Sequence, residues 1–194
     1  MRSKKVLIFD IDGTLVNSGI DWERIRKLFR TSVNIDIDGK PLAEVISSLP
    51  EKVRISLEEA IAEAETSSLK YVRADEELRN LFMKAKRLGY VIVVISLRTR
   101  STATEVLRRL GVMEFVDILV TRDDTPRRDE QLAEVLNVLK AESKHVIFFG
   151  DTPWDAEAAK SLSIRFIRIV GDGRVGSPPE NLLRTLREVL GACQ

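Results

Sequence analysis

A buried strand that ends in two acids constrains this chain more than any other stretch. The run Val6-Leu7-Ile8-Phe9 leads directly into Asp10, and a second acid, Asp12, precedes the turn signal Gly13-Thr14. Four consecutive apolar residues, rich in branched and aromatic side chains, indicate a strand that is covered on both faces. Ligands of open parallel sheets bind at the carboxyl ends of strands, so both acids are candidates for chemistry. The alternative is a plain turn in which Asp10 is only a capping residue.

A second apolar run ends in the same way. Val146 to Phe149 is followed by Gly150 and Asp151, and Asp155 comes four residues after Asp151 at the start of a predicted helix. If both strands belong to one parallel sheet, these acids and those of the first strand meet at one edge. Two carboxylates about 4 Å apart repel by roughly 4 kcal/mol at an effective dielectric near 20, so the cluster must take up protons or hold a cation. Oxygen ligands without His or Cys favour Mg²⁺ over Ca²⁺.

The remainder of the chain alternates between strand and helix patterns. Further strands are predicted at 91–95, 115–120, 145–149 and 164–170, and helices at 74–88, 101–110, 127–140, 153–162 and from Pro178-Pro179 to Leu190. Such alternation predicts an α/β fold: a Rossmann-like parallel sheet of about five strands with helices on both faces. The predicted core comprises residues 1–16 and 73–194.

A long insertion separates the first strand from the second. Residues 17–72 add roughly 55 residues to a crossover that needs only a dozen or so. Apolar residues recur there at helical spacing on two helices, with a shorter helix at 41–49: Trp22, Ile25, Leu28 and Phe29 after the N-cap candidate Asp21, and Val53, Leu57, Ala60, Ile61 and Ala64 after Pro50. These faces must pack on one another, which predicts a small α-helical domain.

Three motifs of this chain resemble those of the haloacid dehalogenase-like hydrolase superfamily, in its phosphoglycolate phosphatase-like branch. Asp10-Ile11-Asp12-Gly13-Thr14 is similar to the first motif, and Gly150-Asp151-Thr152-Pro153-Trp154-Asp155 is similar to the fourth. The strand at 91–95 followed by Ser96 is similar to the second. The resemblance covers nearly the whole chain, and it implies that the insertion is a cap that closes over the substrate. A passive helical bundle is the alternative.

The resemblance also implies roles for individual residues. Asp10 would be the nucleophile of an aspartyl-phosphate mechanism, and Asp12 would protonate the leaving oxygen and then activate water. Mg²⁺ would be the cofactor. Its ligands would be Asp10, Asp12 (through its backbone carbonyl), Asp151 and, in support, Asp155. The predicted phosphate-binding residues are Ser96, Leu97, Arg98, Gly13 and Arg127. Ser96 can equally be explained as a cap of the next element.

The chain departs from the family at the third motif, which supplies a lysine that neutralises charge at the nucleophile. The corresponding loop reads Thr121-Arg122-Asp123-Asp124-Thr125-Pro126-Arg127-Arg128 and contains no lysine. Arginine also binds phosphate well, so Arg127, Arg128, Arg122 or Arg98 can take this place. For any one of them, solvated surface charge is the simpler interpretation. The same choice, with water favoured, applies to Arg24, Arg26 and Arg54 of the insertion.

Two aromatic side chains, Trp154 and His145, invite a functional interpretation with less support. Trp154, between the last two acids, can wall a substrate pocket or simply pack at a helix start. His145, the only histidine, precedes a strand at the edge opposite the acids, and we interpret it as structural despite the catalytic use of histidine elsewhere.

Composition limits the partners and the compartment. The chain has 31 basic and 30 acidic residues, a net charge of +1 that gives no sign of a nucleic-acid partner. No apolar run approaches the 18 or so residues of a membrane span or the length of a signal peptide. Cys193 is the single cysteine, so no intrachain disulfide can form, which fits a reducing compartment. A cytoplasmic location is therefore expected, whereas the oligomeric state is left open.

Together these features predict a Mg²⁺-dependent phosphatase acting on a small phosphorylated metabolite such as a phosphoglycolate-like compound or a sugar phosphate. Two alternatives stay open. The missing lysine favours a weak or inactive relative that binds a phosphorylated ligand or a protein partner, and the same chemistry would serve a phosphomutase. Halide removal is disfavoured, because a dehalogenase needs neither Asp12 nor the metal cluster.

Overall fold

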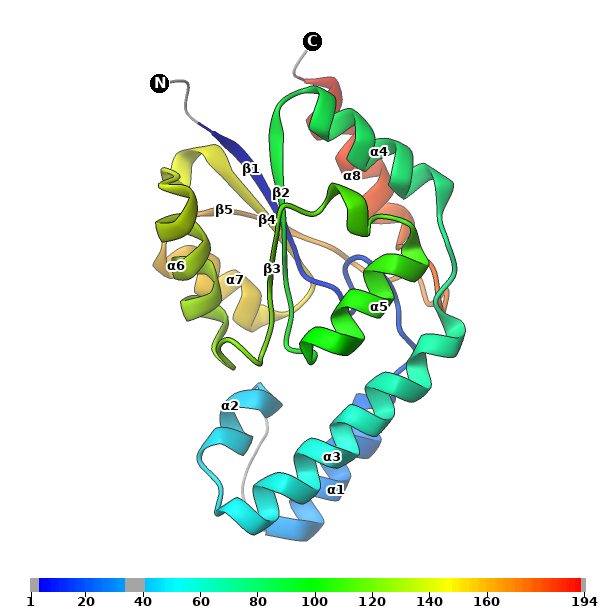
Figure 1. Cartoon of the computed structure of the whole chain (residues 1–194), viewed down its shortest axis with the longest axis vertical. Coiled ribbons are helices and arrows are strands. Elements are labelled where there is room, and N and C mark those ends of the chain that lie inside the picture. Colours follow the sequence, from blue (N-terminus) through cyan, green and yellow to red (C-terminus); the bar gives the residue numbers. More distant parts are fainter. Residues whose placement is uncertain (1–3, 34–40, 193–194) are drawn as a thin grey trace.

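The protein is built around one parallel sheet with helices on both faces (Figure 1). The computed structural model describes residues 4–33 and 41–192, and Cys193 lies outside them. Five strands pair in the order β3-β2-β1-β4-β5, and every pairing is parallel. The strands are β1 (Lys5–Phe9), β2 (Tyr90–Ile95), β3 (Ile118–Val120), β4 (Val146–Gly150) and β5 (Arg165–Arg168). The predicted fold class is confirmed.

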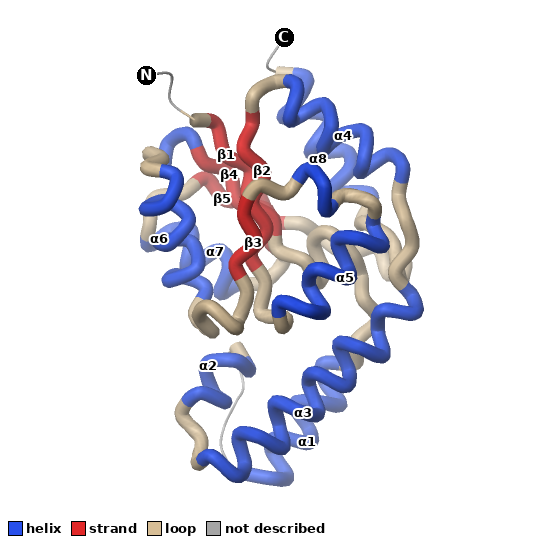
Figure 2. Tube along the Cα trace, viewed as in Figure 1, coloured by secondary structure: helices blue, strands red, loops and turns tan. Residues whose placement is uncertain are grey.

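Helices cover both faces of the sheet (Figure 2). A hydrophobic layer lies between the sheet and the helices on each face. Leu7 and Phe9 of β1 face the layer that contains α4, α5 and α8, whereas Val6 and Ile8 face α6 and α7. The helices of the core are α4 (Glu76–Arg87), α5 (Arg100–Leu110), α6 (Arg128–Leu139), α7 (Pro153–Ser161) and α8 (Glu180–Gly191). Because β1 is central and is buried from Val6 to Phe9, the residue that follows it must emerge at the middle of the sheet edge.

The strand predicted at 115–120 is shorter than the sequence pattern indicates. Residues Met113–Phe115 form a 3₁₀ turn, and the strand begins only at Ile118. Between them, the Asp117 carboxylate accepts a hydrogen bond from the backbone N–H of Ile92 at 2.8 Å. The Asp117 side chain therefore accepts the hydrogen bond that a backbone carbonyl of a longer β3 would accept from Ile92. A count of apolar residues along the sequence does not reveal such a contact.

The insertion after β1 forms a separate helical layer, as predicted. It contains α1 (Trp22–Val33), α2 (Leu42–Ser47) and α3 (Glu51–Ser68), which bury Ile25, Phe29, Ile46, Leu57 and Ile61 against one another. In Figure 1 this layer extends from the core on the side where β1, β2 and β4 end. Asp21 accepts a hydrogen bond from the Arg24 backbone N–H at 2.9 Å, as its N-cap role requires. Leu28 departs from the predicted stripe, because 45% of it is exposed.

The single histidine lies in a short turn before β4. His145 ends a short 3₁₀ turn, Ser143–His145, at the beginning of β4 and thus at the edge opposite the acids.

Among the helices that the structure describes, none combines the length and the apolar character that crossing a bilayer demands.

Candidate active site

Asp10 directly follows β1 and forms an ion pair with Arg128, the first residue of α6. The Asp10 backbone N–H donates to the Phe149 carbonyl oxygen at 3.0 Å, so the β1–β4 pairing extends to this residue. The carboxylate oxygen Oδ1 accepts a hydrogen bond from Arg128 Nη2 at 2.6 Å. Both side chains are buried, with 7% and 5% exposed. A buried carboxylate and a buried guanidinium thus neutralise each other at the centre of the sheet edge.

Arg128 also reaches the acids that follow β4. Its Nε lies 2.8 Å from Asp155 Oδ1, and its Nη1 donates to Gln131 Oε1 at 2.8 Å. Arg128 is the first residue of α6, which directs its side chain inward toward the acids. Burial raises the pKa of Asp10 well above its usual value; Arg128 lowers it, and the nearby acids, Asp155 first among them, raise it further. Arg128 therefore supplies the positive charge that the sequence motif lacks.

The structure places the other arginine candidates away from Asp10. Arg127, predicted to bind phosphate, is exposed and pairs with Asp129 at 2.8 Å and with Glu130 at 3.2 Å. It precedes the first turn of α6, and its guanidinium points to acids of that turn rather than to the sheet edge. Of the alternatives named from the sequence, Arg128 is the one that contacts the predicted nucleophile. The choice between two adjacent arginines depended on the register at which the helix begins, which the sequence did not settle.

Asp12 is held by a second buried arginine. Arg98 donates from Nε to Asp12 Oδ2 at 2.7 Å and from Nη2 to Asp12 Oδ1 at 2.8 Å. This bidentate contact fixes the plane of the Asp12 carboxylate. The Arg98 side chain is 1% exposed. Its Nη2 also donates to Ser68 Oγ at 3.1 Å, at the carboxyl end of α3. The predicted acid–base residue is therefore connected to the helical insertion through one side chain.

A buried carboxylate from the insertion anchors this part of the site. Glu65 of α3 is completely buried and accepts hydrogen bonds from the Thr99 backbone N–H at 3.2 Å and from Thr102 Oγ1 at 2.6 Å. Arg122 donates to its other carboxylate oxygen and to the Leu97 carbonyl oxygen. No apolar pattern indicated this role, because an acid inside the predicted stripe of α3 looks like a solvent-facing residue.

We expect the Thr102→Val substitution to lower the free energy of unfolding by about 1–2 kcal/mol, because it leaves a buried carboxylate oxygen without one of its donors. Denaturant titration of the full-length protein measures the change. Thr104→Val on the same helix is the matched control, since Thr104 is only partly buried and its side chain forms no hydrogen bond in the described part of the chain. Equal stability of both variants and the wild type would contradict this role for Glu65.

The two acids after β4 have different surroundings. Asp155 closes a capping box at the start of α7: its Oδ2 accepts from the Thr152 backbone N–H at 3.1 Å, and its own N–H donates to Thr152 Oγ1 at 3.2 Å. Its other oxygen, Oδ1, forms an ion pair with Arg128 Nε at 2.8 Å. Asp151 has a buried carboxylate oxygen, Oδ1, without a hydrogen-bond partner. Burial and then the charge of Asp155 raise the pKa of Asp151 to about 7.

Gly13 allows Asp151 to approach the first strand. A Cβ atom at this position would lie 2.1 Å from Asp151 Oδ2, and the backbone has a φ of +79°, which side chains disfavour. Asp151 and the turn after Asp12 are therefore in close contact. Widely separated stretches of the sequence, predicted to converge, do converge here.

The predicted metal ligands are the carboxylates of Asp10, Asp151 and Asp155 and the backbone carbonyl of Asp12. In the described residues, 4–33 and 41–192, no three acidic, histidine or cysteine side chains are grouped so that they could enclose an ion. Asp12 and Asp155 are instead engaged by Arg98 and Arg128. Mg²⁺ usually binds to one or two carboxylates and completes its shell with water and substrate oxygens. The unsatisfied oxygen of Asp151, beside the turn of Asp12 and the acid Asp10, fits that mode of binding.

The second-motif residues lie next to these acids. Ser96 directly follows β2 and is 1% exposed, and its hydroxyl oxygen accepts from the Arg98 backbone N–H at 3.2 Å. Its carbonyl oxygen accepts from Gln131 Nε2 at 2.9 Å, a partner that sequence reasoning missed. Leu97 and Gly13 line a cavity between the sheet edge and the insertion. Ser96 thus caps its own loop through its contact with the Arg98 N–H and not the next helix, because the N-cap of α5 is Thr99.

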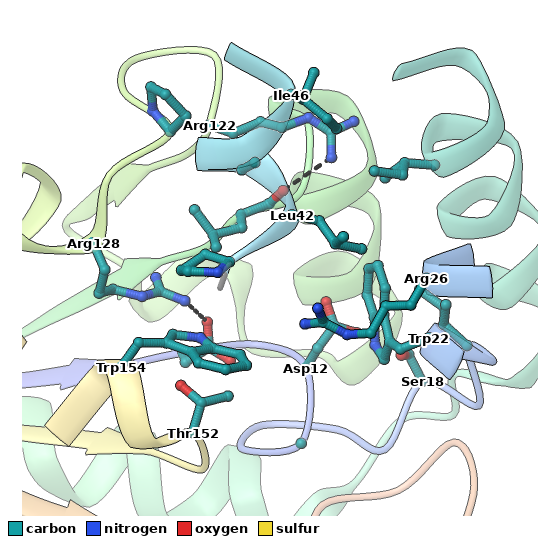
Figure 3. A pocket seen from close by; sticks show the side chains of 18 of the residues that line it. Asp12, Ser18, Trp22, Arg26, Leu42, Ile46, Arg122, Arg128, Thr152 and Trp154 are labelled. Carbon is teal, nitrogen blue, oxygen red and sulfur yellow. Dashed lines mark hydrogen bonds and ion pairs between the residues drawn. The ribbon is translucent and has the colours of Figure 1, made fainter. Parts of the chain in front are cut away.

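A cavity of about 530 Å³ separates the sheet edge from the insertion (Figure 3). Asp10, Asp12 and Asp151 line it from the core, and Trp22, Leu42 and Ile46 line it from α1 and α2. Figure 3 shows Trp154 and Arg128 on one side of this space and Trp22 with Arg26 on the other. The Arg26 guanidinium lies 5.9 Å from the centroid of the Trp154 ring, so this tryptophan does wall the cavity. Of the three insertion arginines, Arg24 is exposed, whereas Arg26 and Arg54 line the cavity.

A parallel sheet beneath a helical insert, with acids and arginines lining the cavity between them, defines an α/β protein with a carboxylate-rich site. Residues 7–169 match the sequence profile of the haloacid dehalogenase-like hydrolases. The chain belongs to this family, and it is an enzyme of the hydrolase class.

Individual relatives agree with this assignment. The chain is 25% identical to pyrophosphatase PpaX of Halalkalibacterium halodurans, over 95% of this chain and 94% of the relative. It is 27% identical to validoxylamine A 7'-phosphate phosphatase of Streptomyces hygroscopicus subsp. limoneus, over 95% of each chain. Among solved structures, a haloacid dehalogenase-like family hydrolase of Streptococcus pneumoniae superposes with a TM-score of 0.67 at 19% identity, covering 100% of both chains. These likenesses extend over the insertion as well as the core.

Proposed function

We propose that this protein is a Mg²⁺-dependent phosphatase that hydrolyses a small phosphomonoester through an aspartyl-phosphate on Asp10. The observation that carries the proposal is the pair of Asp10 and Arg128, buried at the end of the central strand and facing the cavity. Phosphoryl transfer needs a positioned nucleophile and positive charge beside the transferring group, and this pair supplies both. The names of the two relatives, a pyrophosphatase and a phosphate ester phosphatase, support the same class of reaction.

In the first step of the proposed reaction, an Asp10 carboxylate oxygen attacks phosphorus and the bond from phosphorus to the leaving oxygen breaks. Asp12 gives a proton to that oxygen, which leaves as an alcohol. In the second step, Asp12 takes a proton from water as the water oxygen attacks phosphorus, and free phosphate leaves Asp10. Arg98 holds both oxygens of Asp12 in the structure, which suits the base of the second step; in the first step one of these contacts must open.

Asp10, Asp151 and the backbone carbonyl of Asp12 would hold the magnesium ion. When bound, the ion supplies positive charge opposite the phosphate oxygens. The Arg128 guanidinium beside Asp10 supports an active enzyme over an inactive relative, because it carries the kind of charge that the missing lysine would supply. No contact in the described residues favours a phosphomutase over a phosphatase.

Hydrolysis of 4-nitrophenyl phosphate tests the proposal. We expect release of nitrophenol with Mg²⁺ and none after chelation by EDTA, with activity restored by added Mg²⁺. The Asp151→Asn variant should raise the Mg²⁺ concentration for half-maximal activity by at least about tenfold, because it removes a charged ligand. Asp129→Asn, a change in an acid that pairs with Arg127 outside the cavity, should leave that concentration unchanged.

The same titration has an expected pH dependence. Because the pKa of Asp151 lies near 7 in the metal-free protein, a proton competes with the ion below that pH. The Mg²⁺ requirement should therefore rise as pH falls below about 7 and level off above it. Full activity in EDTA, or a requirement that Asp151→Asn does not alter, would contradict the proposed metal site.

A further inference from the structure

The insertion side of the cavity carries an arginine whose hydrogen-bonding capacity is not used. Arg54 lies in the first turn of α3 and lines the cavity. Its Nε is buried and has no hydrogen-bond partner among the residues that the structure describes. Within the same ranges, 4–33 and 41–192, no acid forms an ion pair with Arg54. A buried guanidinium nitrogen without an acceptor is costly, so this group indicates an acceptor that the described residues do not supply.

The nearest acid along the helix does not satisfy it. Glu58 is one turn further along α3, on the same face, and it lines the same cavity. The order of arginine followed by glutamate at this spacing is the weaker one for a helical pair, and no ion pair joins the two side chains in the described structure. Arg54 therefore stays available to a molecule that enters the cavity.

The other arginines of the cavity whose ion pairs are known are already committed. Arg128 binds Asp10 and Asp155, and Arg122 binds Glu65. On the insertion side, four apolar or aromatic side chains that cannot accept a hydrogen bond line the same cavity: Trp22, Leu42, Ile46 and Ile61. An ionic contact is stronger in such surroundings than in water, because the polar competition is removed.

We propose that Arg54 binds a second anionic group of the substrate, carried on its leaving group, so that the enzyme selects phosphomonoesters whose alcohol bears a carboxylate or another phosphate. This inference rests on the proposed function, since it places the transferring phosphoryl group at Asp10. The cavity of about 530 Å³ has room for a small metabolite that reaches from Asp10 on the core side to Arg54 on the insertion side. Its apolar walls suit a short carbon chain between the two anionic ends.

Matched pairs of alkyl phosphates test the proposal. The probes are ω-carboxyalkyl phosphates, the corresponding primary amides, and α,ω-alkanediol bisphosphates of equal chain length. For the wild type, kcat/KM for one of the anionic probes should exceed that for the neutral amide by about tenfold to a hundredfold, the range of a charge-assisted hydrogen bond. The carboxylate and bisphosphate arms distinguish the two sources of the anion.

The Arg54→Gln variant should bring the ratio of anionic to neutral substrate close to one, mainly through a higher KM for the anionic probe. Arg54→Lys should keep part of the preference, and it serves as the second variant if glutamine impairs folding. Arg24→Gln, on an exposed arginine of α1 that does not line this cavity, should keep the full ratio. Absence of an anion preference in the wild type, or a preference that both Arg54 variants retain, would overturn the proposal.

Failure of the inference can be separated from failure of the proposed function. Wild-type hydrolysis of 4-nitrophenyl phosphate without any anion preference refutes only the role of Arg54. If no phosphate ester is hydrolysed, calorimetry measures the Kd values of the same probes for the wild type and for Arg54→Gln, and these values test the Arg54 subsite without turnover. Equal Kd values for anionic and neutral probes in the wild type would then overturn the Arg54 subsite.

Discussion

Asp10→Asn is expected to lose catalytic activity by at least about a thousandfold while the folded protein keeps or gains stability. Activity falls because an amide cannot attack phosphorus. Stability does not fall because burial and the neighbouring acids disfavour the Asp10 carboxylate, as its raised pKa shows. A neutral side chain of the same shape removes this repulsion at neutral pH. Steady-state hydrolysis of an aryl phosphate and the thermal midpoint Tm, both at pH 7, measure the two effects.

The opposed directions make this result informative. A variant that merely unfolds would lose activity and Tm together. Asp129→Asn, the control outside the cavity, should change neither measurement. If Asp10→Asn retained more than about a tenth of the wild-type activity, the assignment of Asp10 as nucleophile would have to be abandoned.

Arg128→Met is expected to lose both activity and stability. Removing the guanidinium leaves the carboxylates of Asp10 and Asp155 in a buried site without their shared cation. Breaking one side of a buried ion pair typically costs up to about 3–5 kcal/mol, and loss of one charge-stabilising group typically costs a hundredfold to a thousandfold in kcat, about 3–4 kcal/mol. Denaturant unfolding and aryl phosphate hydrolysis measure these losses.

The adjacent arginine provides the matched control for this variant. Arg127→Met removes an exposed guanidinium that pairs with Asp129 and Glu130, so both measurements should stay close to those of the wild type. Arg128→Lys keeps the charge but not the several contacts of the guanidinium, and we expect it to restore part of the activity. Equal effects of Arg127→Met and Arg128→Met would contradict the role assigned to Arg128.

The fold was predictable because its signals are local. The three central strands β1, β2 and β4 coincide with short apolar runs, and Asp10 and Asp151 directly follow two of them, so these acids could be brought together from topology alone. The same holds for the insertion, whose helices follow their apolar stripes and the N-cap Asp21. Periodicity and the parallel sheet rule suffice for these features.

The partners of the charged groups could not be predicted in the same way. Choosing Arg128 over Arg127 required the rotational position of the first residue of α6, which changes by about 100° from one residue to the next. Glu65, Ser68 and Gln131 act through contacts across long stretches of sequence, and no pattern around them announces a buried role. The bidentate contact between Arg98 and Asp12 depends likewise on tertiary geometry.

Trapping the covalent intermediate tests the central claim most directly. The wild type and an Asp12→Asn variant, in which the second step should be slow, are mixed with substrate and Mg²⁺, quenched in acid and digested for mass spectrometry. The account predicts one added phosphoryl group on the peptide that contains residue 10, enriched in the Asp12 variant and absent from Asp10→Asn. Turnover with no phosphoryl group on that peptide in either protein, or with the group on another residue, would contradict it.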